Sequence, residues 1–370
     1  MLDLPVIISV FILIAYLSLI VVFIRAWNKT PFFDAEITPT HQELAQQHKP
    51  SVVVCCRNEA HHLPALIDAL KNQGCQSFEL IWVNDHSTDQ TQEVLEKSLI
   101  HFTDAKVIQS PVPGKKQAQR AGILAAKGDF IITTDADCVP ASTWIETMVD
   151  FQSQQQADLI IAPVKFYRGK SLFTRIQQLE FATLVGSGMG AAGAGMPVFC
   201  NAANMAFTRQ AWLESAGDLH EEVLSGDDVF LLHSIKKRKG KVAVLKSMQA
   251  MVVTGYQKTL KSFCRQRLRW ASKTTEYKDV DTIVIGMIVA AINLLMPVLA
   301  VSAVFYLQLW LLFGVVFLLK FMIDALFLMT IRPFFQLKIK VLHVLLLSLL
   351  YPVYAVGVGV FSVFQNRKKW

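Results

Sequence analysis

Long apolar runs lie at both ends of the chain, and a different pattern lies between them. Residues Pro5 to Ile24 carry no charge, and a helix of this length crosses the ~30 Å hydrocarbon core of a bilayer. The segment from Thr282 to Leu319 is also uncharged and is long enough for two marginal crossings, or for one crossing and part of another. Val341 to Phe364 forms a last apolar run. Between Lys49 and about Asp281, short apolar runs alternate with helical patterns, which predicts an α/β domain with a mainly parallel sheet.

The first apolar run fits either a signal peptide or a membrane anchor. Asp3 is the charged residue before the run, Arg25 and Lys29 follow it, and no small-x-small cleavage site is evident. This order of charges favours an anchor. Because positive charges stay on the cytoplasmic side, it also predicts that the N-terminus lies outside and that the following domain lies in the cytosol. We therefore expect a multi-pass protein of the cell membrane.

Charged residues near the C-terminal runs leave the topology open. Lys320 and Asp324 have the i, i+4 spacing of a helix, and they fit a functional intramembrane pair or, as the spacing favours, a neutralised pair near a helix end. With three full crossings after a cytosolic domain, the basic tail Asn366 to Lys369 would face outward, against the positive-inside tendency. Either the last segment bends back at Pro352, or an earlier one lies in the interface, or the tendency fails here.

Three expected strands of the central region end in polar clusters. The strands and the clusters that follow them are Ser51 to Cys56 with Arg57-Asn58-Glu59, Phe78 to Val83 with Asn84-Asp85, and Phe130 to Thr134 with Asp135-Ala136-Asp137. Ligands of open α/β sheets bind at the carboxyl ends of the strands. The pattern therefore predicts a binding site where these clusters meet.

The acidic residues of this edge suggest its chemistry. Asp135 and Asp137 are two carboxylates separated by one alanine, and such oxygen donors suit Mg²⁺ or Mn²⁺ bridging a diphosphate. Asp85 has two equally favoured interpretations. It could bind nucleotide, or it could have only a local role, in an Asx turn or as the N-cap of a helix beginning near Thr88. We expect a metal and diphosphate site at Asp135 and Asp137.

Two further clusters open helices. Lys115 follows Pro113-Gly114 at the start of an expected helix, where amide groups and charge could hold phosphate, although a solvated basic turn is the simpler alternative. Asp227 and Asp228 stand at the front of an apolar helix. N-capping accounts for one of these acids, and the other is free to accept a proton from an acceptor hydroxyl.

Two segments after the strands concern the membrane. Tyr256 to Trp270 reads as a basic amphipathic helix, for which interfacial anchoring is the simple explanation. Gly186 to Gly195 is rich in glycine, alanine and serine, and it fits either a flexible acceptor loop or a tightly packed interfacial turn.

Composition narrows the class of protein. A hydrophobic content of 53% in 370 residues is too high for an ordinary soluble enzyme, and 18% charged residues are too many for a pure membrane bundle. The net charge of +7 comes from basic residues beside apolar runs and from Lys236 to Lys239, which favours anionic lipid and phosphate-bearing substrates over nucleic acid. Six cysteines without CxxC spacing indicate reduced thiols in a cytosolic domain, without a disulfide framework or a zinc site.

In this order, the clusters resemble the family 2 inverting glycosyltransferases with a GT-A fold, especially membrane synthases related to cellulose, hyaluronan and poly-N-acetylglucosamine synthases. The motifs that carry the resemblance are Arg57-Asn58-Glu59, Asn84-Asp85, Asp135-Ala136-Asp137, Gly226-Asp227-Asp228 and Gln266-x-x-Arg269-Trp270. The implied organisation is an anchor (1–27), a linker (28–48), a cytosolic GT-A domain (49–255), an interfacial helix with the Gln-x-x-Arg-Trp motif (256–281) and C-terminal transmembrane segments (282–370).

The resemblance also implies roles for single residues. Glu59 and Asp85 would contact the nucleotide base and ribose, Lys115 would lie near the donor, and Asp135 and Asp137 would hold Mg²⁺ or Mn²⁺ and the diphosphate, with Asp137 the direct ligand. The family usually has Glu-Asp where this chain has Asp227-Asp228, so Asp228 would be the general base and Asp227 a shortened neighbour. On the acceptor and diphosphate side, the residues would be Asn204, Gln266, Arg269 and Trp270.

The resemblance implies an inverting transfer of sugar from a nucleotide-sugar, with a UDP-sugar favoured, to a saccharide or lipid-linked acceptor in polysaccharide or glycolipid synthesis. Its partners would be the donor, the acceptor and membrane lipids, and no nucleic acid. A transferase that adds a single sugar to a lipid is one alternative. A membrane scaffold or transporter whose cytosolic domain merely binds nucleotide is an alternative of another class.

Overall fold

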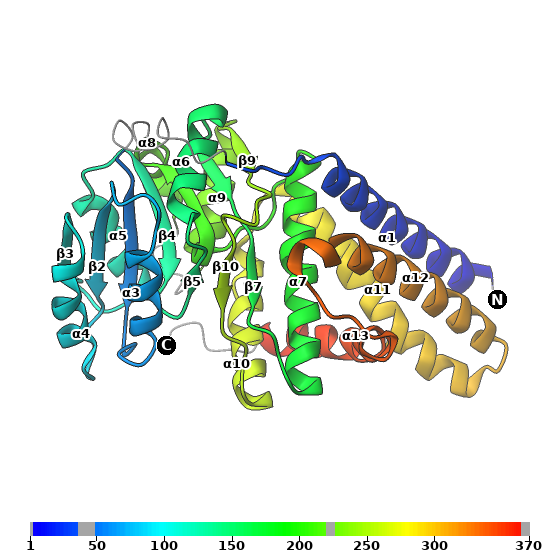
Figure 1. Cartoon of the computed structure of the whole chain (residues 1–370). Helices are drawn as coiled ribbons and strands as arrows, with labels where there is room; N and C mark the ends of the chain where they lie inside the picture. The colour runs from blue at the N-terminus through cyan, green and yellow to red at the C-terminus, as the bar shows by residue number, and fades with distance from the viewer. Residues whose placement is uncertain (1–2, 36–48, 220–225, 364–370) are drawn as a thin grey trace. The chain divides into compact units, whose positions relative to one another are not determined.

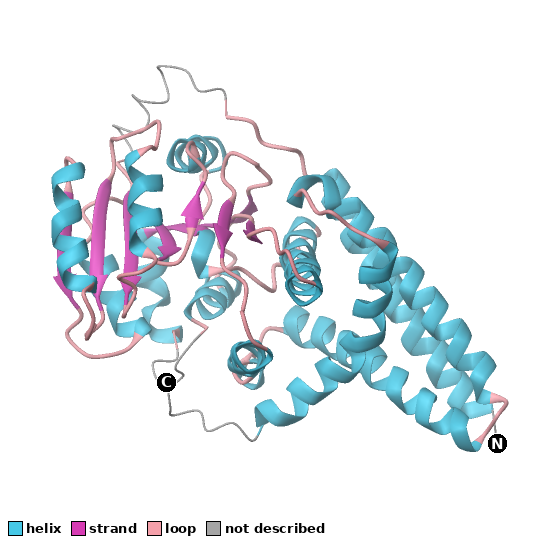
Figure 2. Ribbon diagram, turned by 60° about the horizontal axis from the view of Figure 1, so that its bottom comes forward, coloured by secondary structure: helices cyan, strands magenta, loops and turns pink. Residues whose placement is uncertain are grey.

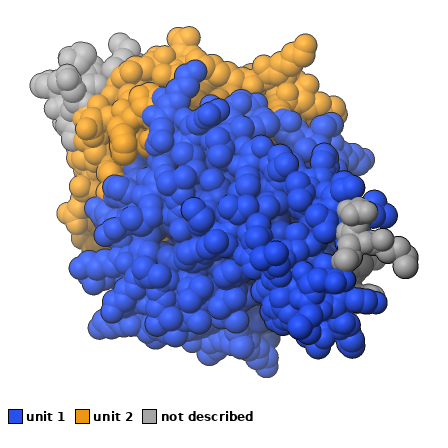
Figure 3. Space-filling view, turned by 90° about the vertical axis from the view of Figure 1, so that its right-hand side faces the viewer, with its two compact units in different colours: residues 1–29, 168–196, 256–369 blue, residues 30–167, 197–255, 370 orange. Residues whose placement is uncertain are grey.

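The computed structural model describes residues 3–35, 49–219 and 226–363, and Figure 1 shows the chain from its N-terminus to its C-terminus. The chain forms two compact units, coloured separately in Figure 3. The α/β unit comprises Thr30–Tyr167 and Pro197–Gly255. The helical unit comprises Met1–Lys29, Arg168–Met196 and Tyr256–Lys369.

A seven-stranded sheet forms the centre of the α/β unit, and helices pack against its strands (Figure 2). Its order is β3-β2-β1-β4-β8-β6-β9, and every neighbouring pair is parallel except those that involve β8. The strands are β1 (Ser51–Cys56), β2 (Glu79–Asn84), β3 (Ala105–Gln109), β4 (Phe130–Asp135), β6 (Leu159–Ile161), β8 (Met205–Thr208) and β9 (Val242–Val244). The prediction of a mainly parallel sheet is confirmed.

Strand register brings the polar clusters to one edge. Cys56 pairs with Asn84 at the ends of β1 and β2, and Cys55 pairs with Asp135 at the end of β4. These strands are continuous apolar runs because helices cover both faces of such a sheet, and Val52, Leu80 and Ile131 are fully buried. The three expected strands are therefore confirmed to within one residue at each end.

A smaller sheet supports the loop after β4. It has the order β5-β10-β7, with β5 (Val139–Pro140), β7 (Val164–Phe166) and β10 (Val252–Thr254). Since β5 begins two residues after Asp137, its pairing with β10 fixes the end of the acidic segment. The remaining helices of this unit are α3 (Leu63–Lys71), α4 (Thr91–Ser98), α5 (Lys115–Ala125), α6 (Trp144–Gln155), α8 (Arg209–Ser215) and α9 (Asp227–Lys237).

The helical unit contains α1 (Asp3–Lys29), α7 (Leu172–Gly193), α10 (Leu260–Ala271), α11 (Val280–Phe305), α12 (Leu309–Phe335) and α13 (Val341–Val363). Among the described residues, four of these helices are long and apolar enough to cross a membrane: α1, α11, α12 and α13. The uncharged span after Thr282 thus holds most of one candidate membrane helix and part of another. Helix α13 continues through Pro352, and the basic tail lies outside the described residues.

The glycine-rich segment is helical, so both expectations for it, a loop and a turn, are wrong. Most of it forms the end of α7. A Cβ atom on Gly190 would lie 3.1 Å from the carbonyl oxygen of Phe23 on α1, and one on Gly186 would lie 3.0 Å from the Ile331 side chain on α12. Close helix packing therefore outweighs the low helix propensity of glycine. Although α7 falls inside the 49–255 range, it groups with the helical unit.

Lys320 and Asp324 form an ion pair in the middle of α12, not near its end as expected. Lys320 Nζ lies 2.6 Å from Asp324 Oδ2, and the Tyr16 hydroxyl of α1 donates to Asp324 Oδ1 at 2.6 Å. The preferred interpretation, a neutralised pair, agrees with this geometry. The Tyr16 hydroxyl adds a third polar group to this pair, and its hydrogen bond joins the apolar helices α1 and α12.

Candidate active site

The loops after β1 and β2 turn sharply and are joined to each other. Asn58 and His86 have φ of 57° and 54°, in the left-handed region that costs a non-glycine residue about 1 kcal/mol. The Asn58 amide N–H donates to Ser87 Oγ, and the Thr88 amide N–H donates to Asn58 Oδ1 at 2.8 Å. The loops that carry Glu59 and Asp85 are therefore held in one arrangement.

Asp85 does not cap a helix. Helix α4 begins at Thr91, whose amide N–H donates to Asp89 Oδ1 at 3.0 Å, so the cap reading of Asp85 is wrong. The Asp85 side chain is buried, and its Oδ1 accepts the Gly114 amide N–H at 2.8 Å. Arg57 Nη1 lies 3.8 Å from the other carboxylate oxygen. Asp85 thus fixes the turn that begins α5.

The two lysines at the start of α5 reach different acidic clusters. Lys115 Nζ lies 2.6 Å from Asp135 Oδ1, and Lys116 Nζ lies 3.0 Å from Asp227 Oδ1. The alternative of a solvated basic turn is therefore wrong. Because Gly114 precedes both lysines with a φ of 136°, the turn has a conformation that other residues rarely adopt.

The acidic segment after β4 offers oxygen ligands for a hard cation. Ligand atoms of Asp135, Asp137 and Cys138 lie within 4.8 Å of one another, and the Asp137 side chain reaches solvent. Burial raises the pKa of the Cys138 thiol well above its usual value, so it is protonated at neutral pH and donates to Asp137 Oδ1 at 3.6 Å. The two carboxylates therefore suit Mg²⁺ or Mn²⁺, whereas the thiol does not.

Negative charge accumulates around this segment. Desolvation and then the charge of Asp135 raise the pKa of Asp137, while Lys115 opposes the shift. Burial and the charge of Asp137 also raise the pKa of Glu59, against the effect of His62, whose Nδ1 lies 2.7 Å from Glu59 Oε2. A cation bound between these carboxylates would relieve their repulsion.

Asp227 and Asp228 begin α9, and neither is its N-cap. Gly226 holds that position with a φ of 102° and no side-chain cap. Asp228 Oδ2 accepts the Ala202 amide N–H at 3.3 Å, which directs this carboxylate toward the loop before β8. Burial raises the pKa of Asp227, and the charge of Lys116 opposes that shift. The two acids thus have different surroundings, as a division of labour requires.

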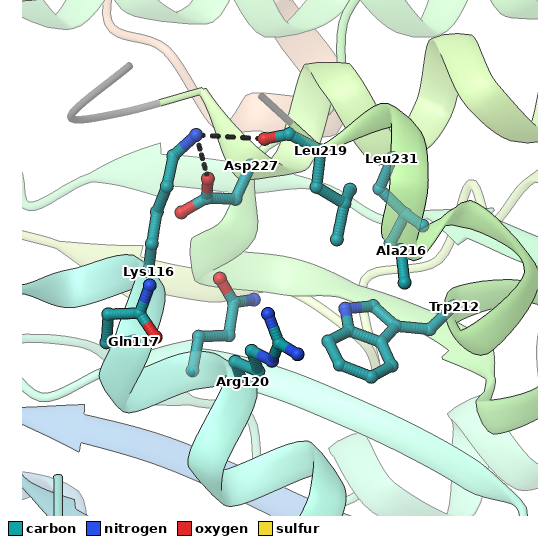
Figure 4. Close-up of a pocket in the computed structure, with 9 residues that line it drawn as sticks. Lys116, Gln117, Arg120, Trp212, Ala216, Leu219, Asp227 and Leu231 are labelled. Atoms are coloured by element: carbon teal, nitrogen blue, oxygen red, sulfur yellow. Dashed lines mark hydrogen bonds and ion pairs between the residues drawn. The ribbon is translucent and has the colours of Figure 1, made fainter. Parts of the chain in front are cut away.

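A pocket opens beside Asp227, between α5, α8 and α9 (Figure 4). In the close-up, the Lys116 ammonium forms an ion pair with Asp227 Oδ1 and donates to the carbonyl oxygen of Leu219, at 3.0 Å in each case. Its lining is Lys116, Gln117, Gln119, Arg120, Trp212, Ala216, Leu219, Asp227 and Leu231. No motif marks Trp212 or Arg120 in the sequence, because only the folded chain brings α8 and α5 together.

Asn204, expected on the acceptor side, is instead a buried structural residue. Its side chain is fully buried, its Nδ2 donates to the carbonyl oxygens of Pro163 and Ala250, and its Oδ1 accepts from Trp144 Nε1 at 2.8 Å. These hydrogen bonds engage both the NH₂ group and the oxygen of the Asn204 amide within the protein interior. Asn204 therefore holds the loop that faces Asp228 and offers no polar group to an acceptor, which corrects the sequence-based expectation.

The structure brings seven of the expected residues to the strand-end region of the α/β unit: Glu59, Asp85, Lys115, Asp135, Asp137, Asp227 and Asp228. Gln266, Arg269 and Trp270 lie on α10 of the helical unit. Helix α10 is amphipathic as expected and starts with a capping box of Thr259 and Ser262. All six cysteines carry free thiols.

Comparison with known proteins identifies the domain. Residues 51–217 match the family model described as glycosyl transferase family 2. A cholesterol galactosyltransferase of Borreliella burgdorferi is 25% identical over 126 residues, which are 34% of this chain and 35% of that protein. Glycosyltransferase GlyG of Streptococcus pneumoniae is 31% identical over 112 residues, 30% of this chain and 37% of that protein. The matches thus span little more than a third of these relatives.

A solved structure shares the fold over most of the chain. The mannosyltransferase PcManGT of Pyrobaculum calidifontis, in complex with GDP-Man and Mn²⁺, superimposes with a TM-score of 0.53 at 16% identity. The similarity covers 90% of this chain and 99% of that one. The expected GT-A fold is confirmed. Residues 51–217 therefore belong to glycosyl transferase family 2, and the chain joins this GT-A domain to helices long and apolar enough to cross a membrane.

Proposed function

We propose that the chain is an inverting glycosyltransferase that moves a sugar from a nucleotide-sugar to a saccharide or lipid-linked acceptor at the membrane. The observation that carries this proposal is the convergence of two carboxylate pairs on one sheet edge. Asp135 with Asp137, and Asp227 with Asp228, are each bridged to α5 by a lysine. One pair suits the leaving diphosphate and the other suits the attacking hydroxyl.

The donor side would use the residues of the first three strand ends. Asp135 and Asp137 would hold Mg²⁺ or Mn²⁺, with the more exposed Asp137 as the direct ligand, and the bound ion would neutralise charge on the leaving diphosphate. Glu59 and Asp85, on loops joined to each other, would contact the base and the ribose. The resemblance favours a UDP-sugar, whereas the solved relative holds GDP-Man.

The acceptor side would use α9. The acceptor hydroxyl oxygen attacks the anomeric carbon as the bond from that carbon to the diphosphate oxygen breaks, and the hydroxyl proton moves to the carboxylate of Asp228. Configuration inverts in such a single displacement. The Ala202 amide orients Asp228, and Lys116 holds Asp227 in place beside the pocket. Gln266, Arg269 and Trp270 of α10 would contact the diphosphate and the acceptor sugar.

The membrane arrangement belongs to the same proposal. The four apolar helices would anchor the chain in the cell membrane, with the catalytic domain in the cytosol. The residues Arg25 and Lys29 after the first helix support this orientation.

The test is release of nucleoside diphosphate by the purified protein in lipid nanodiscs, with UDP-GlcNAc and GDP-mannose as donors and with Mn²⁺, Mg²⁺ or EDTA. Asp228→Asn should lower release by about 10²–10⁴-fold, the usual contribution of a general base, and Asp137→Asn should lower it strongly by weakening the metal site. Asp68→Asn, on the exposed surface of α3, is the matched control and should leave release unchanged. Unchanged release in both site variants would refute the proposed catalytic site, and no metal-dependent release from any donor would support a nucleotide-binding scaffold or transporter instead.

A single addition to a lipid is a second candidate, since one relative is a cholesterol galactosyltransferase. Three of the candidate spans found among the described residues follow the catalytic domain. Mass spectrometry of the products separates the two reactions. A ladder of lengths supports polymer synthesis, and one added sugar supports lipid glycosylation.

A further inference from the structure

Arg267 lies inside the Gln266–Trp270 motif, yet its side chain points into the helical unit. The side chain is 4% exposed. Its Nε donates to Glu180 Oε1 at 2.9 Å, and its Nη2 donates to Glu180 Oε2. The guanidinium and the carboxylate therefore form a two-point ion pair between α10 and α7, the geometry in which arginine binds a carboxylate most specifically.

A third helix contributes to this pair. The Tyr354 hydroxyl of α13 donates to Glu180 Oε1 at 3.4 Å, and the Phe263 ring of α10 packs against the Tyr354 ring with centroids 5.4 Å apart. Burying two charges costs solvation energy that a well-packed apolar contact would not cost. In return, the pair fixes the orientation of α10 relative to α7, because rotation of α10 would leave a charge buried without its partner.

From Arg267 the contacts continue to both ends of the motif. Arg267 Nη1 donates to Gln266 Oε1 at 2.6 Å. The guanidinium carbon lies 4.3 Å from the centre of the Trp270 ring, and Trp270 also packs against Phe181, the neighbour of Glu180 on α7. One arginine thus links the carboxylate of Glu180 to both Gln266 and Trp270.

We propose that Glu180 is a positioning residue for the transfer reaction: through Arg267 it fixes the Gln266 carboxamide and the Trp270 ring in the orientation in which they serve the substrate. The proposal rests on the proposed function of the motif. A glutamine at this position keeps the shape but can accept with only one oxygen, and its NH₂ group opposes the guanidinium. Glu180→Gln therefore loosens the motif without emptying the space around it.

The first experiment measures position without activity. The protein is labelled with 5-fluorotryptophan in nanodiscs, and the resonance of Trp270 among the seven tryptophans is assigned with Trp270→Phe. Glu180→Gln should shift or broaden this resonance. Asp324→Asn, which converts the carboxylate of the other buried ion pair in the same unit, is the matched control and should leave it unchanged. An unchanged Trp270 resonance in the Glu180→Gln protein overturns the proposal.

The second experiment measures coupling in the release of nucleoside diphosphate. Glu180→Gln should lower kcat/KM about ten- to a hundredfold, as expected for displaced contact groups, and should have little further effect in a Gln266→Ala background. An equal loss in both backgrounds would show a general structural role and overturn the proposal. Asp324→Asn should have the same effect in both backgrounds.

The outcomes for the two proposals are separable. If Asp137→Asn abolishes release but Glu180→Gln shows no coupling with Gln266→Ala, the positioning role fails and the transferase stands. If no donor is turned over, the fluorine spectrum still decides whether Glu180 positions Trp270. Should Glu180→Gln fail to fold, Tyr354→Phe removes only the hydroxyl bonded to Glu180 and should shift the same resonance by a smaller amount. No shift would again overturn the proposal.

Discussion

Gly114→Ala isolates the contribution of one backbone conformation to the site. Gly114 has a φ of 136°, and a Cβ atom there would meet nothing within 4 Å, so the substitution introduces no steric clash. The backbone strain costs about 1–3 kcal/mol. If the chain relaxes instead, the amide N–H leaves the buried carboxylate of Asp85, 2.8 Å away, at a cost of about 1–3 kcal/mol. Because the chain follows the cheaper of these two routes, the expected loss of stability is about 1–3 kcal/mol and not their sum.

The loss should also affect the reaction, since Lys115 and Lys116 follow Gly114 directly and pair with Asp135 and Asp227. Thermal unfolding in nanodiscs should show a Tm lowered by about 2–12 °C, at about 2–4 °C per kcal/mol for a domain of this size. Release of nucleoside diphosphate should fall in parallel.

Gly217→Ala is the matched control for this variant. A Cβ atom on Gly217 also meets nothing within 4 Å, and its φ lies outside the left-handed region, so the substitution should leave Tm unchanged or raise it by about 1–4 °C. If the Gly114→Ala and Gly217→Ala proteins unfold at the same temperature, the conformation of Gly114 does not constrain α5, and the reasoning is refuted.

Three other substitutions test buried polar contacts. Burial opposes the charge of Glu79, but hydrogen bonds from Ser51, the Lys127 amide and Lys106 outweigh it and lower its pKa; Glu79→Gln should therefore cost about 1–3 kcal/mol at pH 7. The carboxylate contributes stability above its unfolded pKa of about 4.3, so the difference in chemical unfolding between the two proteins should disappear as pH falls from 5 to 3. Asn204→Ala leaves Trp144 Nε1 and the Ala250 carbonyl oxygen, both buried, without their hydrogen bonds and should cost about 2–4 kcal/mol in chemical unfolding, whereas a mild loss of activity at native stability would favour an acceptor contact. Tyr16→Phe removes one interhelical hydrogen bond and should cost about 0.5–1.5 kcal/mol in detergent unfolding; no change would mean that Lys320 alone satisfies Asp324.

The sequence alone was sufficient for the parts whose physical cause is local. A strand buried on both faces must be a continuous apolar run, so β1, β2 and β4 and the polar clusters at their ends could be read directly. The apolar helices could be read because crossing hydrocarbon requires a long uncharged segment. Even the amphipathic helix α10 follows from the spacing of its own residues.

Tertiary structure decided whatever depends on partners distant in the chain. The local sequence around Asn204 does not reveal whether its amide faces solvent or the protein interior. In the folded chain the amide accepts a hydrogen bond from the buried indole of Trp144. The glycines at the end of α7 oppose helix formation locally, and only the close approach of α1 and α12 compensates for them. The spacing of α10 places Arg267 on the same face as Phe263, but only the folded chain brings Glu180 against it. Local periodicity specifies the elements, but the energy of a buried charge or amide depends on the group that meets it, and only the folded chain specifies that group.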